Sequence, residues 1–158
     1  MNKPTFRQYT AFIVLSEAVG LLSGLLSREG TVLYSQLTAK PPLSPPGWLF
    51  PVVWTVLYAL MGIGAARLWA YPKSQARSRG LNLFIAQLIV NFFWSPIFFN
   101  ARAYGLAFSW LLLLWALVFL MIREFRKADP SAAYLQLPYL LWLTFAAYLN
   151  WSIWQMNR

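Results

Sequence analysis

The chain has 158 residues, of which 59% are hydrophobic and only 11% are charged, whereas a soluble domain carries about 25% charged residues. Cysteine and histidine are absent, so the sequence offers no disulfide, no thiolate nucleophile and no imidazole base or metal ligand. The net charge of +9 comes from basic residues grouped between long apolar runs rather than from a basic stripe interleaved with stacking aromatics. The composition therefore predicts an integral membrane protein and argues against a nucleic-acid partner.

The acidic residues argue against hydrolytic and metal-assisted chemistry. Only Glu17, Glu29, Glu124 and Asp129 carry carboxylates, and they are too far apart to suggest a catalytic pair or a metal site. An iron porphyrin would lack histidine, its commonest axial ligand. We therefore expect no resident metal or cofactor, and planar hydrophobic molecules such as metal-free tetrapyrroles or lipids are the better ligand candidates.

Five apolar runs approach the roughly twenty residues that a helix needs to cross a bilayer. They predict an all-α integral membrane protein in which five transmembrane helices form a single bundle, one domain over residues 1–158. The predicted spans are 6–26, 46–69, 81–100, 104–122 and 133–155.

The first span is predicted to be a retained helix, because it is too long for a signal-peptide core and lacks a small-residue cleavage site. Ser16, Gly20 and Gly24 lie four apart, which predicts close approach by a neighbouring helix. Glu17 falls inside the span, where a carboxyl group should face protein or water. Two interpretations stay open: a proton or ligand role, or a structural role in which Glu17 is protonated or bonded to a neighbouring helix.

A long proline-rich first loop is predicted over residues 31–46, after a helix end at residues 28–30. Prolines at positions 41, 42, 45 and 46 fix φ and bias the preceding residues toward extended conformations, so the segment should be stiff. Loops of this length are often binding elements. With Tyr34 and Pro45, it is expected to fold over one end of the bundle.

The second and third spans carry faces of distinct chemistry. Phe50, Trp54 and Tyr58 recur every four residues, so three rings share one face of the second helix. Gln87, Asn91 and Ser95 have the same spacing in the third span and form a polar stripe that should face the bundle interior. Pro96 is expected to kink the end of that helix.

The fourth span is almost entirely apolar, and the fifth supplies a second aromatic wall. In the fifth span Trp142, Ala146 and Asn150 share one face, flanked by Tyr139 and Leu149. The small residue at the centre would let a flat ligand lie close to the backbone. Aromatic walls from the second and fifth spans could bury both faces of a planar tetrapyrrole, and Lys40 with the loop backbone could meet its carboxylates.

Basic residues also predict the orientation, because five spans place the termini on opposite sides. The four on one side are Arg28, Lys40, Arg102 and Arg158; the nine on the N-terminal side are Lys3, Arg7, Arg67, Lys73, Arg77, Arg79, Arg123, Arg126 and Lys127. The positive-inside bias then predicts a cytoplasmic N-terminus, in what we expect to be a bacterial cell membrane.

Three separated motifs resemble the TspO/translocator protein family, also called tryptophan-rich sensory proteins or peripheral benzodiazepine receptors. The first is Lys40-Pro41 with Pro45-Pro46-Gly47, followed by Trp54, Leu57, Tyr58, Met61-Gly62 and Gly64. The second is Asn91 with Ser95-Pro96-Ile97-Phe98-Phe99, and the third is Leu137-Pro138-Tyr139-Leu140-Leu141-Trp142 with Phe145-Ala146, Tyr148-Leu149-Asn150 and Trp154. The resemblance covers essentially the whole chain.

The resemblance implies a homodimeric five-helix receptor in membrane lipid that binds porphyrins, sterols or benzodiazepine-type ligands under its first loop. Some bacterial members are reported to degrade protoporphyrin with light and oxygen, a reaction attributed to two tryptophans that match Trp54 and Trp142. Together with the faces above, the expected ligand-binding residues are Tyr34, Pro45, Phe50, Trp54, Tyr58, Asn91, Ser95, Tyr139, Trp142, Ala146 and Leu149.

The chain also departs from the family pattern. Leu43 stands where the family often has a tryptophan, and the sterol-recognition pattern of animal members is absent because the next basic residue after Tyr148 is Arg158. A transporter of tetrapyrroles or lipids is the alternative function, although the five spans show no evident internal repeat.

Overall fold

A computed structural model gives the structure of residues 3–158, apart from the side chain of Leu37. Over this range the chain is helical, and five helical segments are long and apolar enough to cross a membrane, which confirms the predicted architecture. The elements are α1 (Phe6–Leu26), α2 (Arg28–Leu37), α3 (Leu49–Trp69), α4 (Gln75–Ser95), the π-helical turn η1 (Pro96–Asn100), α5 (Tyr104–Ala128), α6 (Pro130–Tyr134) and α7 (Leu137–Met156).

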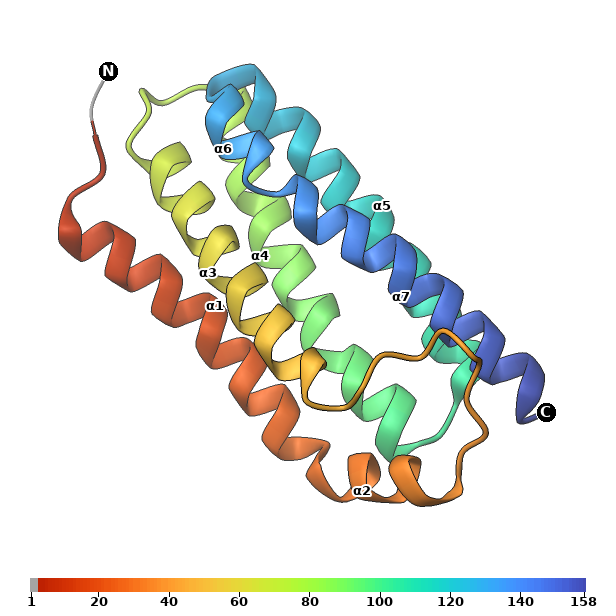
Figure 1. Cartoon of the computed structure of the whole chain (residues 1–158). Helices are drawn as coiled ribbons and strands as arrows, with labels where there is room; N and C mark the ends of the chain where they lie inside the picture. The colour runs from red at the N-terminus through yellow and green to blue at the C-terminus, as the bar shows by residue number, and fades with distance from the viewer. Residues whose placement is uncertain (1–2) are drawn as a thin grey trace.

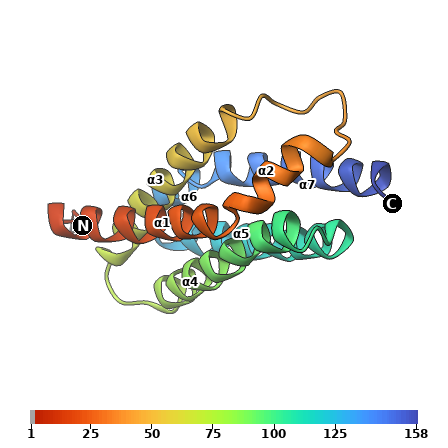
Figure 2. The same cartoon turned by 90° about the horizontal axis from the view of Figure 1, so that it is seen from below.

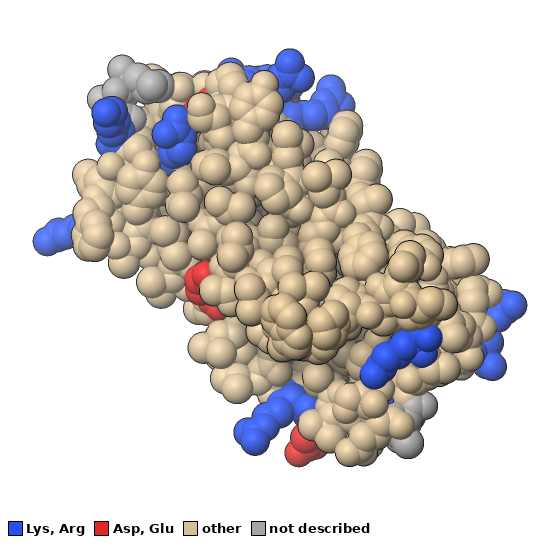
Figure 3. Space-filling view, in the orientation of Figure 1, with Lys and Arg blue, Asp and Glu red and all other residues tan. Residues whose placement is uncertain are grey.

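The long helices run side by side, and the two termini lie at opposite ends of the bundle (Figure 1). The main packing pairs are α4 with α5, α1 with α3, and α5 with α7. Helix α2 and the connection to α3 cross the end of the bundle opposite the N-terminus (Figure 1). Figure 2 shows this connection as an arch that leads from the end of α2 to the start of α3 and stands away from the packed helices. On the face shown in Figure 3, lysine and arginine side chains gather toward both ends and leave a band between them without basic side chains.

Large apolar side chains fill the interior, with Met61, Leu68, Phe84, Met121 and Phe125 fully buried. Many others face outward, as expected for a surface in contact with acyl chains. Helix α1 is the extreme case, because its only buried residues are two serines.

Small residues allow close packing at positions that differ from the predicted one. The closest backbone approach is at Gly62 of α3, where a Cβ atom would collide with the backbone of Ile13. Of the predicted small-residue face, Gly20 accommodates the ring of Tyr58 rather than a helix backbone, and a Cβ atom at Gly24 would meet no atom within 4 Å. The predicted face therefore meets the neighbouring helix α3 at Gly20, through the ring of Tyr58, and leaves open space at Gly24.

The largest departure from the predicted boundaries is α2, which occupies the first part of the predicted loop. Gly30 does not end a helix; it lies inside α2, where a Cβ atom would collide with Phe99 and Asn100. A glycine at this position lets α2 pack directly on η1. The helix ends at Leu37, shortly before the proline run that starts at Pro41.

Other boundaries shift by a few residues. Helix α4 begins at Gln75 because the Ser74 hydroxyl caps it, accepting a hydrogen bond from the Arg77 N–H at 3.1 Å. Helix α5 continues to Ala128, and the last span opens with α6, for which Asp129 is the N-cap. Pro96 produces a π-helical turn closed by a 3.0 Å bond from the Ala101 N–H to its carbonyl, rather than a simple kink.

Candidate functional site

The half of the bundle next to α2 contains a cavity of about 960 Å³. We call this half the outer half, and its α2 end the outer end, without reference to the sides of the membrane. The cavity is lined by residues of α1, α2, the connection to α3, α3 itself, α4, η1, α5 and α7. This volume lies at the upper end of the range typical of small-molecule sites. Its walls are mostly apolar, so it suits a large hydrophobic ligand.

The two predicted aromatic faces meet in this cavity. Trp54 of α3 and Trp142 of α7 both line it, with their ring centroids 6.5 Å apart and their planes nearly perpendicular. Phe50 packs edge-on against Trp142 at 5.8 Å, and Tyr58 lies 5.5 Å from Trp54. Rings from separate spans therefore form one continuous aromatic corner rather than two opposed walls.

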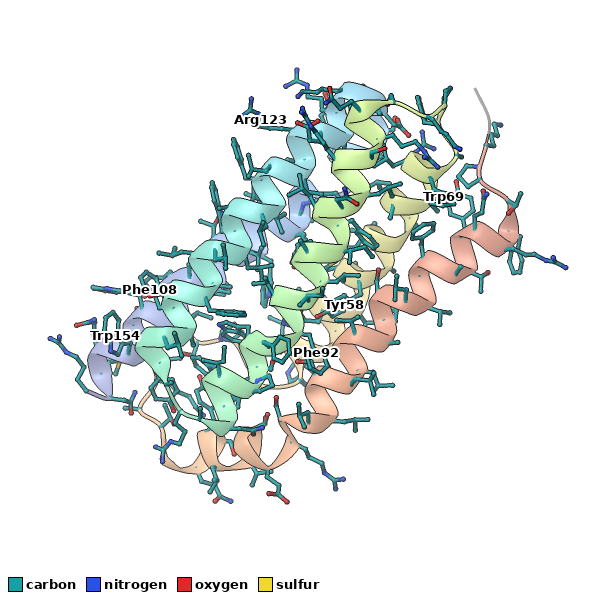
Figure 4. The ribbon with its side chains drawn as sticks, turned by 180° about the vertical axis from the view of Figure 1, so that it is seen from behind. Tyr58, Trp69, Phe92, Phe108, Arg123 and Trp154 are labelled. Atoms are coloured by element: carbon teal, nitrogen blue, oxygen red, sulfur yellow. The ribbon has the colours of Figure 1, made fainter. Side chains whose placement is uncertain are left out.

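Helix α1 covers the side of the cavity next to Tyr58. Figure 4 shows Tyr58 in the middle of the bundle between α3 and α1. Its ring occupies the space that a side chain at Gly20 would fill, and Gly24 leaves further room one turn on. Gly20 therefore makes room for the Tyr58 ring, and the missing side chain of Gly24 helps to create the cavity.

A hydrogen-bonded chain behind the aromatic corner holds α3, α4 and α7 together. The Tyr58 hydroxyl donates to Asn91 Oδ1, and Asn91 Nδ2 donates to the Tyr139 hydroxyl at 2.7 Å. Tyr139 in turn donates to Gln87 Oε1 at 2.8 Å. The predicted polar stripe thus faces the interior, where it links helices, and of these four residues Tyr58 and Asn91 also line the cavity.

Tyr139 occupies a different place from the one predicted. It is fully buried behind Trp54, at 6.1 Å between ring centroids, and is not among the residues that line the cavity. Its hydroxyl bonds to Asn91 and Gln87, so its side chain turns toward α4 instead of the cavity. Tyr139 positions the aromatic corner and does not border the ligand space.

The remaining predicted residues of α4 and α7 lie at the outer part of the cavity, where Ser95, Ala146 and Leu149 all line it. Nearby, Asn150 Oδ1 accepts a hydrogen bond from the Trp94 indole at 3.1 Å, and its amide nitrogen donates to the Tyr104 carbonyl at 2.9 Å. The amide of Asn150 is therefore already occupied by protein partners.

Tyr34 and Pro45 cover the outer end, as predicted. The Tyr34 ring packs 5.2 Å from Phe99, and Lys40 Nζ lies 4.9 Å above the same ring. Burial, reinforced by the neighbouring Tyr104, raises the pKa of Tyr34 to about 12, so this phenol stays neutral and able to donate.

Two side chains that sequence reasoning missed attach this cover to the bundle. Asn157 forms two hydrogen bonds with the backbone of Ala39, at 3.0 Å and 2.9 Å. The hydroxyls of Thr38 and Tyr104 lie 2.8 Å apart. No periodic pattern marks Asn157 or Thr38, because Asn157 lies beyond the end of the last predicted span and Thr38 lies in the segment expected to be loop.

Glu17 also lines the cavity, from the middle of α1. Within residues 3–158 its carboxyl group has no hydrogen-bond partner, so the structure does not show a bond to a neighbouring helix. The two other interpretations, a protonated structural carboxyl group and a proton or ligand role, stay open. The residue is half-exposed and borders the cavity without being enclosed by protein, so the expectation that a carboxyl group at this depth avoids lipid stays a prediction.

The fold and the site together define a class: a five-helix integral membrane protein with an aromatic-lined cavity beneath a covering loop. A sequence model of the TspO/MBR family matches residues 12–155, and the chain belongs to that family.

Relatives from animals and bacteria resemble most of the chain. The translocator protein of Ovis aries is 39% identical over 132 residues, which are 82% of this chain and 78% of the relative. The tryptophan-rich protein TspO of Chlorobaculum tepidum is 35% identical over 146 residues, 92% of each chain. The tryptophan-rich sensory protein of Cereibacter sphaeroides is 34% identical over 118 residues, which cover 75% of this chain and 73% of the relative.

Proposed function

We propose that this protein is a membrane receptor that binds tetrapyrroles of the porphyrin class in the cavity. The observation that carries the proposal is the aromatic corner of Trp54 and Trp142 within a cavity of about 960 Å³. A flat macrocycle has two large apolar faces, and burying them stabilises a complex by roughly 25 cal/mol per Å². Offset and edge contacts with indoles add to this. Other flat apolar ligands, including sterols and benzodiazepine-type compounds, would use the same surfaces.

A titration of the purified protein with protoporphyrin in the dark, followed by tryptophan fluorescence, tests binding. We expect saturable quenching, because several indoles border the cavity. Ala146→Phe adds a ring to the cavity wall and should weaken binding by about tenfold or more, equivalent to ~1.4 kcal/mol. Leu141→Phe is the matched control on the same helix, since Leu141 is 71% exposed. Equal binding by wild type and Ala146→Phe would place the ligand elsewhere.

We also propose a light-dependent reaction in which Trp54 and Trp142 act on the bound porphyrin. Their mutual contact would bring an indole against any macrocycle in the aromatic corner. The light-excited porphyrin would take one electron from an indole, and dioxygen would add to the resulting porphyrin radical anion. The oxygenated product would return one electron to the indole radical cation, so that the indole is regenerated and only porphyrin and dioxygen are consumed. Trp54→Phe with Trp142→Phe should keep dark binding yet abolish bleaching of the porphyrin band under light. Trp151→Phe, at an exposed position on α7, is the control. Unchanged bleaching in the double variant would remove this role.

A tetrapyrrole or lipid transporter is the alternative function, and proteoliposomes separate it from a receptor. A receptor would hold porphyrin on the side of addition in proportion to the amount of protein, whereas a transporter would deliver it continuously to the interior. The cover attached by Asn157 and Thr38 favours a receptor, because it supports a cavity closed toward the outer end.

The orientation and the oligomeric state belong to the same proposal. The nine basic residues of the N-terminal side and the four of the other side favour a cytoplasmic N-terminus in a cell membrane. Because the chain has no cysteine, Ser78→Cys and Ser35→Cys provide single labelling sites at opposite ends of the bundle. A membrane-impermeant thiol reagent added to intact cells should label Ser35→Cys alone. A homodimer would appear in detergent as twice the mass of the chain.

A further inference from the structure

Helices α1 and α4 form an apolar groove on the surface of the bundle, separate from the cavity. The groove has a volume of about 220 Å³, and its walls include Leu15, Val19, Ile85 and Ile89. None of its residues lines the cavity. Ile85 is 46% exposed and Ile89 55%, so the groove opens toward the acyl chains. At one end the Ser23 hydroxyl of α1 donates to the Phe92 carbonyl of α4 at 2.6 Å, and Figure 4 shows Phe92 between these two helices.

The other end of the groove leads to Arg77, near the start of α4. Arg77, Phe84 and Leu88 are spaced by seven and four residues, so they share one face of α4. Leu88 lines the groove, and the Phe84 ring packs 6.0 Å from Phe12 of α1. Phe12 also lies 5.9 Å from Trp69, whose ring is 4.8 Å below the Arg77 guanidinium. A row of apolar and aromatic side chains therefore joins the groove to a cation.

Trp69 orients Arg77 and leaves most of its donors free. Arg77 Nε and Nη2 donate to the Trp69 carbonyl at 3.2 Å and 2.9 Å while the guanidinium lies over the indole. A guanidinium carries five N–H groups, of which these bonds use two. Within residues 3–158 no acidic side chain forms an ion pair with Arg77. The remaining N–H groups form a fixed fork of the kind that binds phosphate oxygens.

The charge around Arg77 favours an anion. Lys73 and Arg79 are exposed at the same end of the bundle. Both acidic side chains of this end are already in ion pairs of 2.9 Å: Asp129 with Arg67, and Glu124 with Lys127. An anionic lipid would compensate the excess of positive charge, whereas a second copy of the chain packed here in parallel would add to it.

We propose that the α1/α4 groove and Arg77 together bind an anionic phospholipid. Its phosphate accepts hydrogen bonds from Arg77, and one of its acyl chains lies in the groove. Arg77 precedes Ile85 by eight residues, which is about 12 Å along α4. One leaflet of the hydrocarbon core is about 15 Å thick, so a chain anchored at Arg77 reaches the groove. The surrounding basic side chains select an acidic headgroup over a zwitterionic one.

Native mass spectrometry of the protein in a neutral detergent tests the site. The probes are phosphatidylglycerol, which is anionic, and phosphatidylcholine with the same acyl chains, which is zwitterionic. The quantity compared is the ratio of their affinities for the first lipid bound. We expect wild type to prefer phosphatidylglycerol by about tenfold, and Arg77→Gln to reduce this preference by about fivefold, the effect of one basic residue at an anionic lipid surface.

Two pairs of variants separate the site from general attraction. Arg79→Gln is the control for Arg77→Gln, because it removes the same charge from an exposed position on another face of α4. It should change the preference by less than about twofold. Ile89→Trp fills the groove and should weaken both lipids without changing their ratio. Leu112→Trp, at a similarly exposed position on α5, should weaken neither.

Several outcomes would overturn the site. The absence of a preference in wild type would do so, as would equal losses in Arg77→Gln and Arg79→Gln, which indicate diffuse attraction to a positive surface. Unchanged lipid binding by Ile89→Trp would exclude the groove, and the loss of a dimer from the same spectra would assign the groove to a second copy. Circular dichroism reports that the variants are folded.

Discussion

Replacing Asn91 by leucine should destabilise the bundle, because Asn91 joins α3 to α7 through its two amide atoms. The substitution keeps the approximate volume and removes both the acceptor of the Tyr58 hydroxyl and the donor to Tyr139. Tyr139 keeps its bond to Gln87, so Tyr58 alone loses its partner. Interhelical hydrogen bonds in membranes average about 0.6 kcal/mol, and a buried group left unpaired costs about 1–3 kcal/mol. Since the Tyr58 residue also borders the cavity, we expect a total near the lower limit, about 1–2 kcal/mol.

A double-mutant cycle tests this reasoning. The free energy of unfolding would be measured by SDS titration in mixed micelles, followed by circular dichroism, for Asn91→Leu, Tyr58→Phe and their combination. The Tyr58–Asn91 bond is lost in all three, so Asn91→Leu should cost about 0.5–1.5 kcal/mol less in the Tyr58→Phe background. Ser109→Ala is the control, because Ser109 bonds only within its own helix, and its effect should add to that of Tyr58→Phe. Additivity of the Tyr58 and Asn91 substitutions would refute the link.

Three further substitutions probe the covering loop, the cavity wall formed by α1, and the half-buried phenol of Tyr34. Asn157→Ala removes both bonds to Ala39, so stopped-flow fluorescence should show porphyrin associating and dissociating faster, with a smaller change in the equilibrium constant. Gly20→Ala places a methyl group against the ring of Tyr58 and should reduce porphyrin affinity without unfolding the protein; unchanged affinity would show that this wall is not used. Burial raises the pKa of Tyr34 to about 12, so the neutral phenol stabilises the folded state fully below about pH 10, and this stabilisation is lost as the pH rises toward 12. Tyr34→Phe should flatten the decline in the free energy of unfolding over that window.

Periodicity predicted the parts of the molecule that repeat. Five apolar runs became five spans, and a four-residue spacing placed the rings of Phe50, Trp54 and Tyr58 on one face that lines the cavity. The same spacing placed Asn91 in the interior, although its amide is engaged by other helices. These features follow from helix geometry, which depends only on the spacing of residues within one segment.

Features that depend on two distant segments could not be predicted in this way. Gly30 suggested a helix end, and only the presence of η1 against it explains a glycine inside α2. Tyr139 looked like a lining residue until the position of α4 showed where its hydroxyl finds partners. The attachment of the cover by Asn157 joins residues 118 positions apart, for which one sequence gives no local signal.

The shallow packing of α1 bears on how a guest reaches the interior. This helix forms one side of the cavity, buries only Ser16 and Ser23, and joins the next helix through the single residue Ser27. Displacing it therefore exposes fewer buried residues than displacing α3, which buries eight. We expect hydrophobic molecules dissolved among the acyl chains to enter sideways past α1, so that the bilayer itself acts as the reservoir that loads the protein.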